Sequence, residues 1–317
     1  MKILAIGEAM VEFNQTRDSD AAHYLQGFGG DTSNFLIAAA RQGAECGYIS
    51  AVGDDTNGAM LQALWASEGI DARHVQVREG APTGIYLVTH SSGGHEFTFY
   101  RKDSAASRMT PSDLPPLGSP TRYLHLSGIS LALSSDFCDL CYAAMESAAA
   151  NGITVSLDTN LRLKLWSVNR ARAILNDVLS LADSALPSYD DISTISGLSD
   201  PDALVDYCLT RGSKIVALKL GDKGAIVADS KSRYRIAPFP CTPVDATGAG
   251  DAFGGAFIAR LAEGDTIDEA GRYAAVTAAL STEGYGAVKP IPSRQQVLAT
   301  LQAHPDYGPF TSSPVPF

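Results

Sequence analysis

Short apolar runs alternate with longer, helix-like segments along most of this 317-residue chain. The short runs have the length and composition of buried β-strands and lie at 2–7, 46–52, 123–127, 154–158 and 214–220. The helix-like segments, several of which end at a glycine, lie at 32–42, 56–68, 136–151, 170–181, 250–263 and 266–281. Because parallel strands need helical crossovers, this alternation predicts an α/β fold with a mostly parallel sheet covered on both faces.

One region interrupts the alternation. Two strand-like runs at 85–90 and 96–101 are joined by two serines and two glycines, which is typical of a β-hairpin. We expect this antiparallel flap, drawn from about 84–102, to join an extended stretch at about 12–28 in a small sheet set apart from the body. Residues 1–304, this small sheet included, are predicted as one domain, followed at 305–317 by an irregular tail rich in Pro, Ser and Gly.

The charge balance excludes one class of partner. The chain has 24 Lys and Arg against 35 Asp and Glu, a net charge of −11, which repels polyanions and predicts no nucleic-acid partner. The first residues are too short an apolar run for a signal peptide, and no apolar stretch approaches the ~18 residues of a membrane span. We therefore predict a cytoplasmic protein without a membrane partner.

The run from Pro243 to Phe257 is the strongest chemical signal in the sequence. Small residues at Gly248, Ala249 and Gly250 let backbone amides approach an anion at the start of a helix, whose dipole adds to the attraction. Asp251 follows in the first turn, placed to accept a proton from a hydroxyl that attacks a phosphate. Alternatively, Asp251 is only a favourable first-turn carboxylate at an ordinary glycine-rich helix start.

A second glycine motif lies near the amino terminus. Gly29 and Gly30 precede Asp31 and Asn34, and the side chains of Asp31, Thr32 and Ser33 are candidate caps for the helix that follows. Together with the run around Asp251, this motif resembles the two signatures of the PfkB, or ribokinase-like, family of carbohydrate kinases, and the resemblance covers nearly the whole chain.

The resemblance implies a fold, a reaction and several site residues. The expected fold is a three-layer α/β/α body with a small β-sheet lid, and the expected reaction is ATP-dependent phosphorylation of a sugar with Mg²⁺. In this family the carboxylate matching Asp251 is the catalytic base and the amides matching 248–250 form the anion hole. The residues that match sugar contacts are Gly30, Asp31 and Asn34.

Three further segments resemble those of 2-keto-3-deoxygluconate kinases within the family. They lie at 99–107, 127–131 and 158–166, and the last holds Asn160, which the resemblance assigns to the sugar. A sugar acid carries a carboxylate, which an arginine fork recognises in bidentate fashion. Arg101 and Arg162 are the candidates. The alternatives are a surface ion pair for Arg101 and a structural hydrogen bond for Arg162.

Two lid aromatics bear on the substrate. Tyr86, on the first hairpin strand, has a hydroxyl for the sugar, although a lid strand equally needs aromatics for packing. Phe99 shares a face with Arg101 because strand side chains alternate. The family often has a hydroxylated aromatic at this position, and Phe99 cannot hydrogen-bond.

The nucleotide side is predicted from three short segments. Lys219, Gly221 and Gly224 follow a buried strand and resemble the ATP-side loop of the family, although the same residues suit a hairpin turn. Ser188 and Asp191 occupy the positions of an Asn-x-x-Glu segment associated with Mg²⁺ and phosphate, and both differ from it. Asp245 and Thr247 resemble part of a monovalent-cation loop, which suggests K⁺. 

We therefore predict an ATP-dependent kinase that phosphorylates the 6-hydroxyl of 2-keto-3-deoxygluconate and assembles as a homo-oligomer through its lid. A fructokinase or another neutral-sugar kinase of the family is the main alternative, followed by an inactive ligand-binding homologue. An NAD-dependent oxidoreductase would need a glycine-rich fingerprint after the first strand, and residues 7–10 do not provide one.

Overall fold

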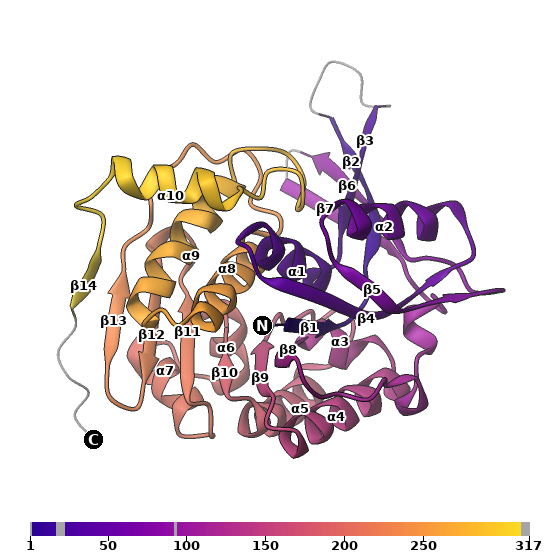
Figure 1. The fold of residues 1–317 in the computed structure, drawn as a ribbon, viewed down its shortest axis with the longest axis horizontal. Coiled ribbons are helices and arrows are strands. Elements are labelled where there is room, and N and C mark those ends of the chain that lie inside the picture. The colour runs from indigo at the N-terminus through magenta and orange to yellow at the C-terminus, as the bar shows by residue number, and fades with distance from the viewer. Residues whose placement is uncertain (1, 17–22, 92–93, 312–317) are drawn as a thin grey trace.

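Ten strands form the central sheet of the computed structural model, which describes residues 2–16, 23–91 and 94–311 (Figure 1). In sheet order they are β14 (Pro309–Thr311), β13 (Arg233–Ile236), β12 (Ala225–Asp229), β11 (Ile215–Lys219), β10 (Ser184–Ala185), β9 (Thr154–Asp158), β8 (Thr121–Ser127), β1 (Lys2–Ile6), β4 (Glu45–Gly53) and β5 (Asp71–Arg78). All neighbours from β5 to β11 pair in parallel, and β12, β13 and β14 add antiparallel strands at one edge. The predicted mostly parallel sheet is confirmed.

Helices cover both faces of the sheet, so the body has three layers (Figure 1). Strand β1 shows why, because Leu4 and Ile6 pack into one hydrophobic core while Ile3 and Ala5 pack into the other. The first core is closed by α3 (Gly128–Leu133), α4 (Ser135–Ala150), α5 (Val168–Leu181), α6 (Tyr189–Ser196) and α7 (Pro201–Leu209). The second is closed by α1 (Asp31–Arg41), α2 (Thr56–Ser67), α8 (Ala249–Glu263), α9 (Ile267–Ser281) and α10 (Arg294–Ala303).

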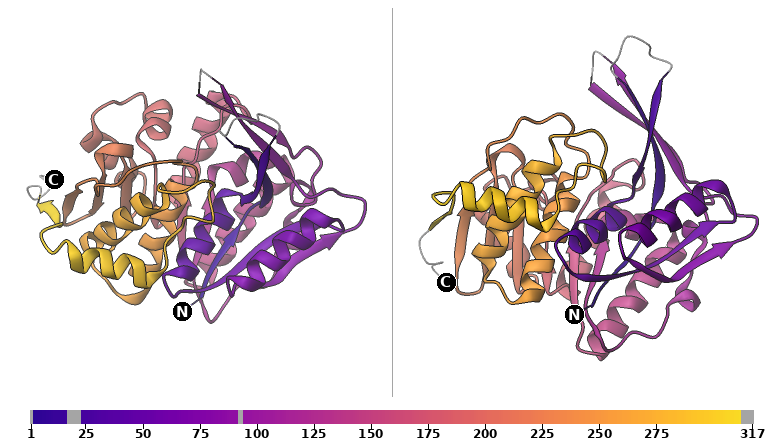
Figure 2. Two further views of the ribbon diagram at one scale, coloured as in Figure 1. Left: turned by 90° about the horizontal axis from the view of Figure 1, so that it is seen from above. Right: turned by 45° about the horizontal axis from the view of Figure 1, so that its top comes forward.

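A separate sheet of four strands projects from the body, as Figures 1 and 2 show. Its order is β3 (Tyr24–Gly29), β2 (Met10–Gln15), β6 (Ile85–Ser91) and β7 (Gly94–Tyr100). The predicted hairpin is β6–β7, and its registers pair Tyr86 with Phe99. The early extended stretch supplies β2 and β3, so the expected lid sheet is present in the structure.

The structure differs from the sequence-based expectations at both ends of the chain. None of the side chains expected to cap α1 does so: Gly30 is the cap residue, with φ of 106°, and Asp31 already belongs to the first turn. A Cβ at position 30 would collide with the carbonyl oxygen of Glu8, so glycine is required there. The tail is not wholly irregular, because β14 pairs with β13. Residues 312–317 lie outside the described residues.

The helix of residues 294–303, α10, also was not predicted, since its polar sequence shows little apolar periodicity. Ser293 caps it, and Val297 is the residue that it buries fully. No helix in the described part of the chain is long and apolar enough to span a membrane.

Candidate active site

A cleft of about 990 Å³ lies between the lid sheet and the body. Lid residues line one side, and the carboxyl ends of β9 and β11 with the amino ends of α1 and α8 line the other. Ligands of open α/β sheets bind at such strand ends. The sequence-predicted residues that line it are Gly30, Asp31, Asn34, Tyr86, Arg101, Asn160, Arg162, Ser188, Asp191, Lys219, Gly221, Thr247, Gly248, Gly250 and Asp251.

The amino terminus of α8 offers free backbone amides to the cleft. Gly248 is the cap residue, with φ of 77°, and neither its amide nor that of Gly250 donates to any described residue. The amide of Ala249 instead donates to the carbonyl of Ala246 at 3.2 Å. Ala249 therefore does not provide the free amide that the sequence suggests, because its N–H closes the turn that leads into the helix.

Asp251 is partly buried on the cleft wall. Its Oδ2 accepts a hydrogen bond from Nδ2 of Asn34 at 2.9 Å. Burial raises the pKa of Asp251 to about 8, the nearby Asp31 and Asp158 carboxylates add to the increase, and Asn34 and Lys219 oppose it. Oδ1 of Asn34 is buried without a hydrogen-bond partner among the described residues, so it can accept from a ligand hydroxyl.

Asp31 is held by two donors from neighbouring elements. Its Oδ2 accepts from the hydroxyl of Ser127 and from Nδ2 of Asn160, the latter at 3.1 Å. Burial raises the pKa of Asp31 in spite of these hydrogen bonds. The side chain that was predicted as a helix cap thus joins α1 to the end of β8 and to the segment that follows β9.

Asp158, which the sequence reading did not single out as a site residue, also lines the cleft, at the carboxyl end of β9. Its Oδ2 forms an ion pair with Nζ of Lys219, and its Oδ1 accepts from the backbone amide of Asn160 at 3.1 Å. That hydrogen bond holds Asn160 at φ of 29°, an uncommon left-handed conformation. The sequence did contain a signal for Asp158, because this residue is the first of the segment that also holds the predicted site residues Asn160 and Arg162.

Arg101 lines the cleft and forms a buried ion pair. The surface ion pair that the sequence analysis gave as its alternative role is not what the structure shows. Its Nη2 lies 2.5 Å from Oε2 of Glu8. Glu8 is 3% exposed, and its Oε1 accepts a hydrogen bond from the hydroxyl of Ser104. Nε of Arg101 is buried without a hydrogen-bond partner among the described residues. The Nε–H of the guanidinium is thus a donor without a partner. Glu8, which the sequence analysis did not identify as a site residue, balances the charge of Arg101.

Arg162 lies on the exposed rim of the cleft. Its Nη1 donates to the carbonyl of Leu161 at 2.9 Å, so the structural hydrogen bond considered for it is present. This bond uses one of five donors and leaves the rest of the fork for a ligand.

The hydroxyl of Tyr86 points into the lid. It donates to Oε2 of Glu12 at 2.5 Å, and both residues are buried. The hydroxyl is therefore already used within the protein, and Tyr86 offers the cleft its ring. Phe99 also lines the cleft and is 41% exposed.

The segment after β11 is both a hairpin turn and a cleft wall. Residues 221–223 form a single 3₁₀ turn between the antiparallel strands β11 and β12. Gly221 lines the cleft, whereas Gly224 does not. Gly224 has φ of 87°, and a Cβ there would collide with the carbonyl oxygen of Ile236, so this glycine is needed by the turn itself.

Ser188 and Asp191 form the start of α6. The hydroxyl of Ser188 accepts from the amide of Asp191 at 3.2 Å as a helix cap. Oδ2 of Asp191 accepts from the amide of Leu161 at 3.1 Å and the hydroxyl of Thr159 at 3.3 Å, and burial raises its pKa. The pair therefore secures the 158–162 segment while facing the cleft.

Asp245 and Thr247 organise the loop before α8. Oδ1 of Asp245 accepts from the amide and the hydroxyl of Thr247 at 2.9 and 2.7 Å, and Oδ2 accepts from the amide of Gly286 at 3.0 Å. Within the described residues, no group of three or more His, Cys, Asp or Glu is arranged to hold a metal ion.

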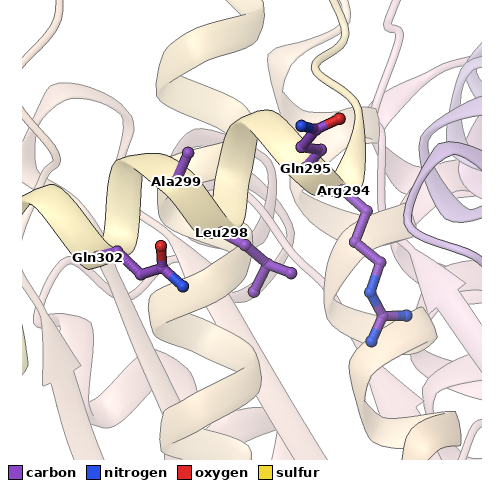
Figure 3. Close-up of a pocket in the computed structure, with 5 residues that line it drawn as sticks. All are labelled: Arg294, Gln295, Leu298, Ala299 and Gln302. Atoms are coloured by element: carbon purple, nitrogen blue, oxygen red, sulfur yellow. The ribbon is translucent and has the colours of Figure 1, made fainter.

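A second hollow, of about 540 Å³, lies along α10 (Figure 3). Of its five lining residues only Arg294 is charged, and Figure 3 shows the side chains of Gln295 and Arg294 extending in different directions from α10. Nη2 of Arg294 donates to Glu263 at 2.9 Å, so the guanidinium is already paired. The chemistry of the molecule is concentrated in the cleft.

Comparison with curated proteins gives relatives that match almost end to end. A 2-dehydro-3-deoxygluconokinase of Bacillus subtilis is 30% identical, over 96% of this chain and 97% of the relative. The enzyme of the same description from Thermoproteus tenax is 32% identical, over 96% and 95%. Fructokinase-2 of Solanum lycopersicum is 30% identical, over 95% and 96%.

Solved structures give the same result for the fold. A fructokinase of Vibrio cholerae, determined with fructose, ADP and a calcium ion, matches with a TM-score of 0.85 and 28% identity, over 94% of this chain and 98% of that chain. A candidate ribokinase II of E. coli, in complex with ATP and Mg²⁺, matches with a TM-score of 0.87 and 29% identity, over 96% and 99%. The family model described as pfkB family carbohydrate kinase matches residues 1–294. The chain therefore belongs to the pfkB family of carbohydrate kinases.

Proposed function

We propose that this kinase transfers the γ-phosphoryl group of ATP to the 6-hydroxyl of 2-keto-3-deoxygluconate. Two relatives that are 30% and 32% identical to the chain carry the corresponding description. The observation that carries the proposed reaction is the meeting, in one cleft, of a carboxylate of raised pKa with the open amides of a helix start.

Asp251 accepts the proton of the attacking hydroxyl. Its raised pKa suits this role, because a general base works best when its pKa lies near the operating pH. Asn34 fixes the carboxylate through Oδ2 and leaves the other oxygen for the hydroxyl. The free carbonyl oxygen of Asn34 orients the sugar by accepting from a second hydroxyl.

The amides of Gly248 and Gly250 stabilise the negative charge on the phosphoryl group during transfer. Fixed donors of this kind contribute most of the catalysis in such reactions, since they need no reorganisation. The carboxylate of Asp191 on the cleft wall suits Mg²⁺, which binds oxygen ligands and the phosphates of ATP. When bound, Mg²⁺ would neutralise part of the charge on those phosphates.

The sugar carboxylate is assigned to two arginines. Arg162 presents free donors from the rim, and Arg101 presents its unpaired Nε from beside the lid. A carboxylate with two charge-assisted contacts is fixed in orientation as well as bound. The lid carries Phe97 and Phe99 on the cleft side and excludes water when the sugar is bound.

A fructokinase is the second candidate, and one observation favours it. Glu8 balances the charge of Arg101, which reduces the attraction of that side for an anionic sugar. Fructokinase-2 of Solanum lycopersicum is also as similar to the chain as the kinase of Bacillus subtilis.

ADP release across 2-keto-3-deoxygluconate, fructose, ribose and adenosine separates these candidates. We expect the highest kcat/KM with 2-keto-3-deoxygluconate. A higher value with fructose would replace the substrate assignment and leave the kinase assignment in place, whereas no release with any acceptor would favour an inactive homologue. Two expectations remain predictions: K⁺ dependence through the loop of Asp245 and Thr247, and a homo-oligomer formed through the lid.

A further inference from the structure

An ammonium group lies among the carboxylates of the cleft floor. Lys219, at the carboxyl end of β11, pairs with Asp158, at the carboxyl end of β9. Strand β10 lies between these two strands, so the pair bridges over it. The side chains are only 13% and 7% exposed, which makes this a largely desolvated ion pair and not a surface contact.

The same ammonium lies beside the open amides of α8. A Cβ built on Gly250 would come 3.4 Å from Nζ of Lys219, and its next neighbours would be carbon atoms of the same lysine side chain. Any anion that binds the amide of Gly250 is therefore within reach of Lys219. The absence of a side chain at position 250 keeps this approach open.

We propose that Asp158 holds Lys219 as an exchangeable counter-ion, whose ammonium moves to the transferred phosphoryl group when ATP and sugar fill the cleft. Lys219 is then a catalytic residue, and Asp158 is a positioning residue that acts through it. The inference rests on the proposed site around Asp251 and extends it.

The exchange of partners by Lys219 is consistent with a phosphoryl transfer in which all bonds and protons are accounted for. In the transfer, a bond forms between the sugar oxygen and phosphorus while the bond from phosphorus to the ADP oxygen breaks, and the hydroxyl proton goes to Asp251. Lys219 stays protonated and exchanges one anionic partner for another, so no other reactant is needed. A phosphoryl group with several charged oxygens is a stronger partner than one carboxylate, because each adds a charge-assisted hydrogen-bond acceptor.

The pair also influences the ionisation of Asp251. Asp31 on α1 and Asp158 on β9 raise the pKa of Asp251, while Asn34 and Lys219 lower it. Other titratable groups close to this cluster include Asp191 on α6, whose pKa is raised by burial and by Asp158, and His125 on β8, whose pKa is lowered to about 3 by burial and by Lys219. Tyr86 and Arg101 approach it from the lid. His125 is therefore neutral near pH 7 and adds no charge.

The two members of the pair are thus expected to shift the pH profile in opposite directions. Removing the ammonium in Lys219→Met raises the pKa of Asp251, so the acid limb of kcat/KM moves to higher pH. Removing the carboxylate charge in Asp158→Asn lowers the pKa of Asp251 and moves the limb to lower pH. The Asn side chain keeps an acceptor for the amide of Asn160.

The experiment measures kcat, KM and the pH profile of the full-length enzyme and its variants with ATP and the preferred sugar. We expect Lys219→Met to lower kcat about 100-fold, with the sugar KM changed less than about threefold, and Lys219→Arg to recover part of the loss. The matched control is Lys214→Met, because Lys214 precedes the same strand and pairs with Asp183 at the surface, where it is 78% exposed.

Binding of the non-hydrolysable ATP analogue AMP-PNP by calorimetry gives a readout that does not depend on turnover. We expect Lys219→Met to weaken binding about tenfold and Asp158→Asn to strengthen it, since the ammonium then has no competing charge. Parallel pH shifts in both variants, unchanged analogue binding, or a kcat for Lys219→Met within about threefold of the wild type would overturn the proposal.

Failure of this inference can be told apart from failure of the proposed function in two cases. If the wild type phosphorylates no sugar, the proposed function fails and analogue binding alone decides the role of Lys219. If Asp158→Asn does not fold, as judged by circular dichroism, the three lysine variants still decide it.

Discussion

Asn34 and Asp251, 217 positions apart in the chain, are joined by a hydrogen bond of 2.9 Å between Nδ2 and Oδ2. The bond links the first turn of α1 to the first turn of α8, and these are the two glycine-led helix starts that face the cleft. The proposed base is therefore fixed by a residue that is assigned to the sugar side of the site. This arrangement supports a transfer in which the orientation of the hydroxyl and its deprotonation occur together.

The first prediction concerns Asp251→Asn. The amide cannot accept the hydroxyl proton, so kcat is expected to fall by about 10³-fold or more. Binding of sugar and ATP should persist, since the shape of the side chain is kept, and calorimetry with AMP-PNP measures this. An unchanged kcat would remove Asp251 from the mechanism.

The second prediction concerns pH. The proposed base, Asp251, can act only when it is ionised, and burial with two nearby carboxylates raises its pKa to about 8. We expect kcat/KM to rise with pH through the region of pH 8 and to level off above it, when rates are measured in buffers of constant ionic strength. A plateau already reached by pH 6 would contradict the proposed environment of this carboxylate.

The third prediction concerns stability. The pKa of Asp251 is raised above its ordinary value of 3.8, so the folded protein binds this proton more tightly than the unfolded chain. The corresponding contribution to stability is present at low pH and is lost as pH rises from about 4 to about 8. The side chain in Asp251→Asn does not ionise, so this variant does not lose stability as the pH rises. We expect the variant to be more stable than the wild type at pH 8 by on the order of 2 kcal/mol.

Thermal unfolding followed by circular dichroism checks this third prediction. At pH 8 the variant should have the higher Tm, and at pH 4 the two proteins should unfold at nearly the same temperature. A variant less stable than the wild type at pH 8 would mean that the hydrogen bond from Asn34 outweighs the cost of burial.

Much of the fold could be predicted because its determinants are local. Apolar runs and glycine stops locate five of the seven parallel strands and most of the long helices, and the two-serine, two-glycine turn locates the hairpin. Strands β5 and β10 and helices α6 and α7 were not predicted. Helix α10 and strand β14 were not predicted, since α10 is polar with one fully buried residue and β14 gains its structure only by pairing with β13.

The site residues that belong to a continuous sequence motif could be predicted. The residues whose role depends on an interaction with a distant part of the chain could not. The glycines and Asp251 belong to one continuous run. In contrast, Glu8 and Asp158 are recognised only through the arginine and the lysine that they hold, which are 93 and 61 positions away. The hydroxyl of Tyr86 could not be assigned from sequence because Glu12 reaches it across the lid.

The fourth prediction concerns the sugar carboxylate. Arg162→Leu removes a fork on the cleft rim, and we expect KM for 2-keto-3-deoxygluconate to rise about tenfold or more, with KM for fructose changed less than about threefold. Lys164→Met is the matched control, because Lys164 lines the same rim two residues away and lacks the fork. Equal losses with both sugars would count against carboxylate recognition.

The fifth prediction concerns the contact that brings Asn34 to Asp251. A Cβ on Gly255, one turn after Asp251, would collide with the carbonyl oxygen of Phe35 in α1, a backbone atom that cannot move away by changing rotamer. We expect Gly255→Ala to separate the two helices, to destabilise the protein by about 2 kcal/mol and to lower kcat, since Asn34 and Asp251 are drawn apart.

Gly254→Ala is the matched control for this contact. Its added Cβ would lie 3.3 Å from Cδ1 of Leu186 and from Cδ2 of Phe35, and both of these are side-chain atoms that can shift slightly. Tm and kcat of the two variants, measured side by side, separate a general cost of alanine in α8 from the loss of this helix contact. If Gly255→Ala kept the kcat of Gly254→Ala, close packing of α1 on α8 would not be what positions the base.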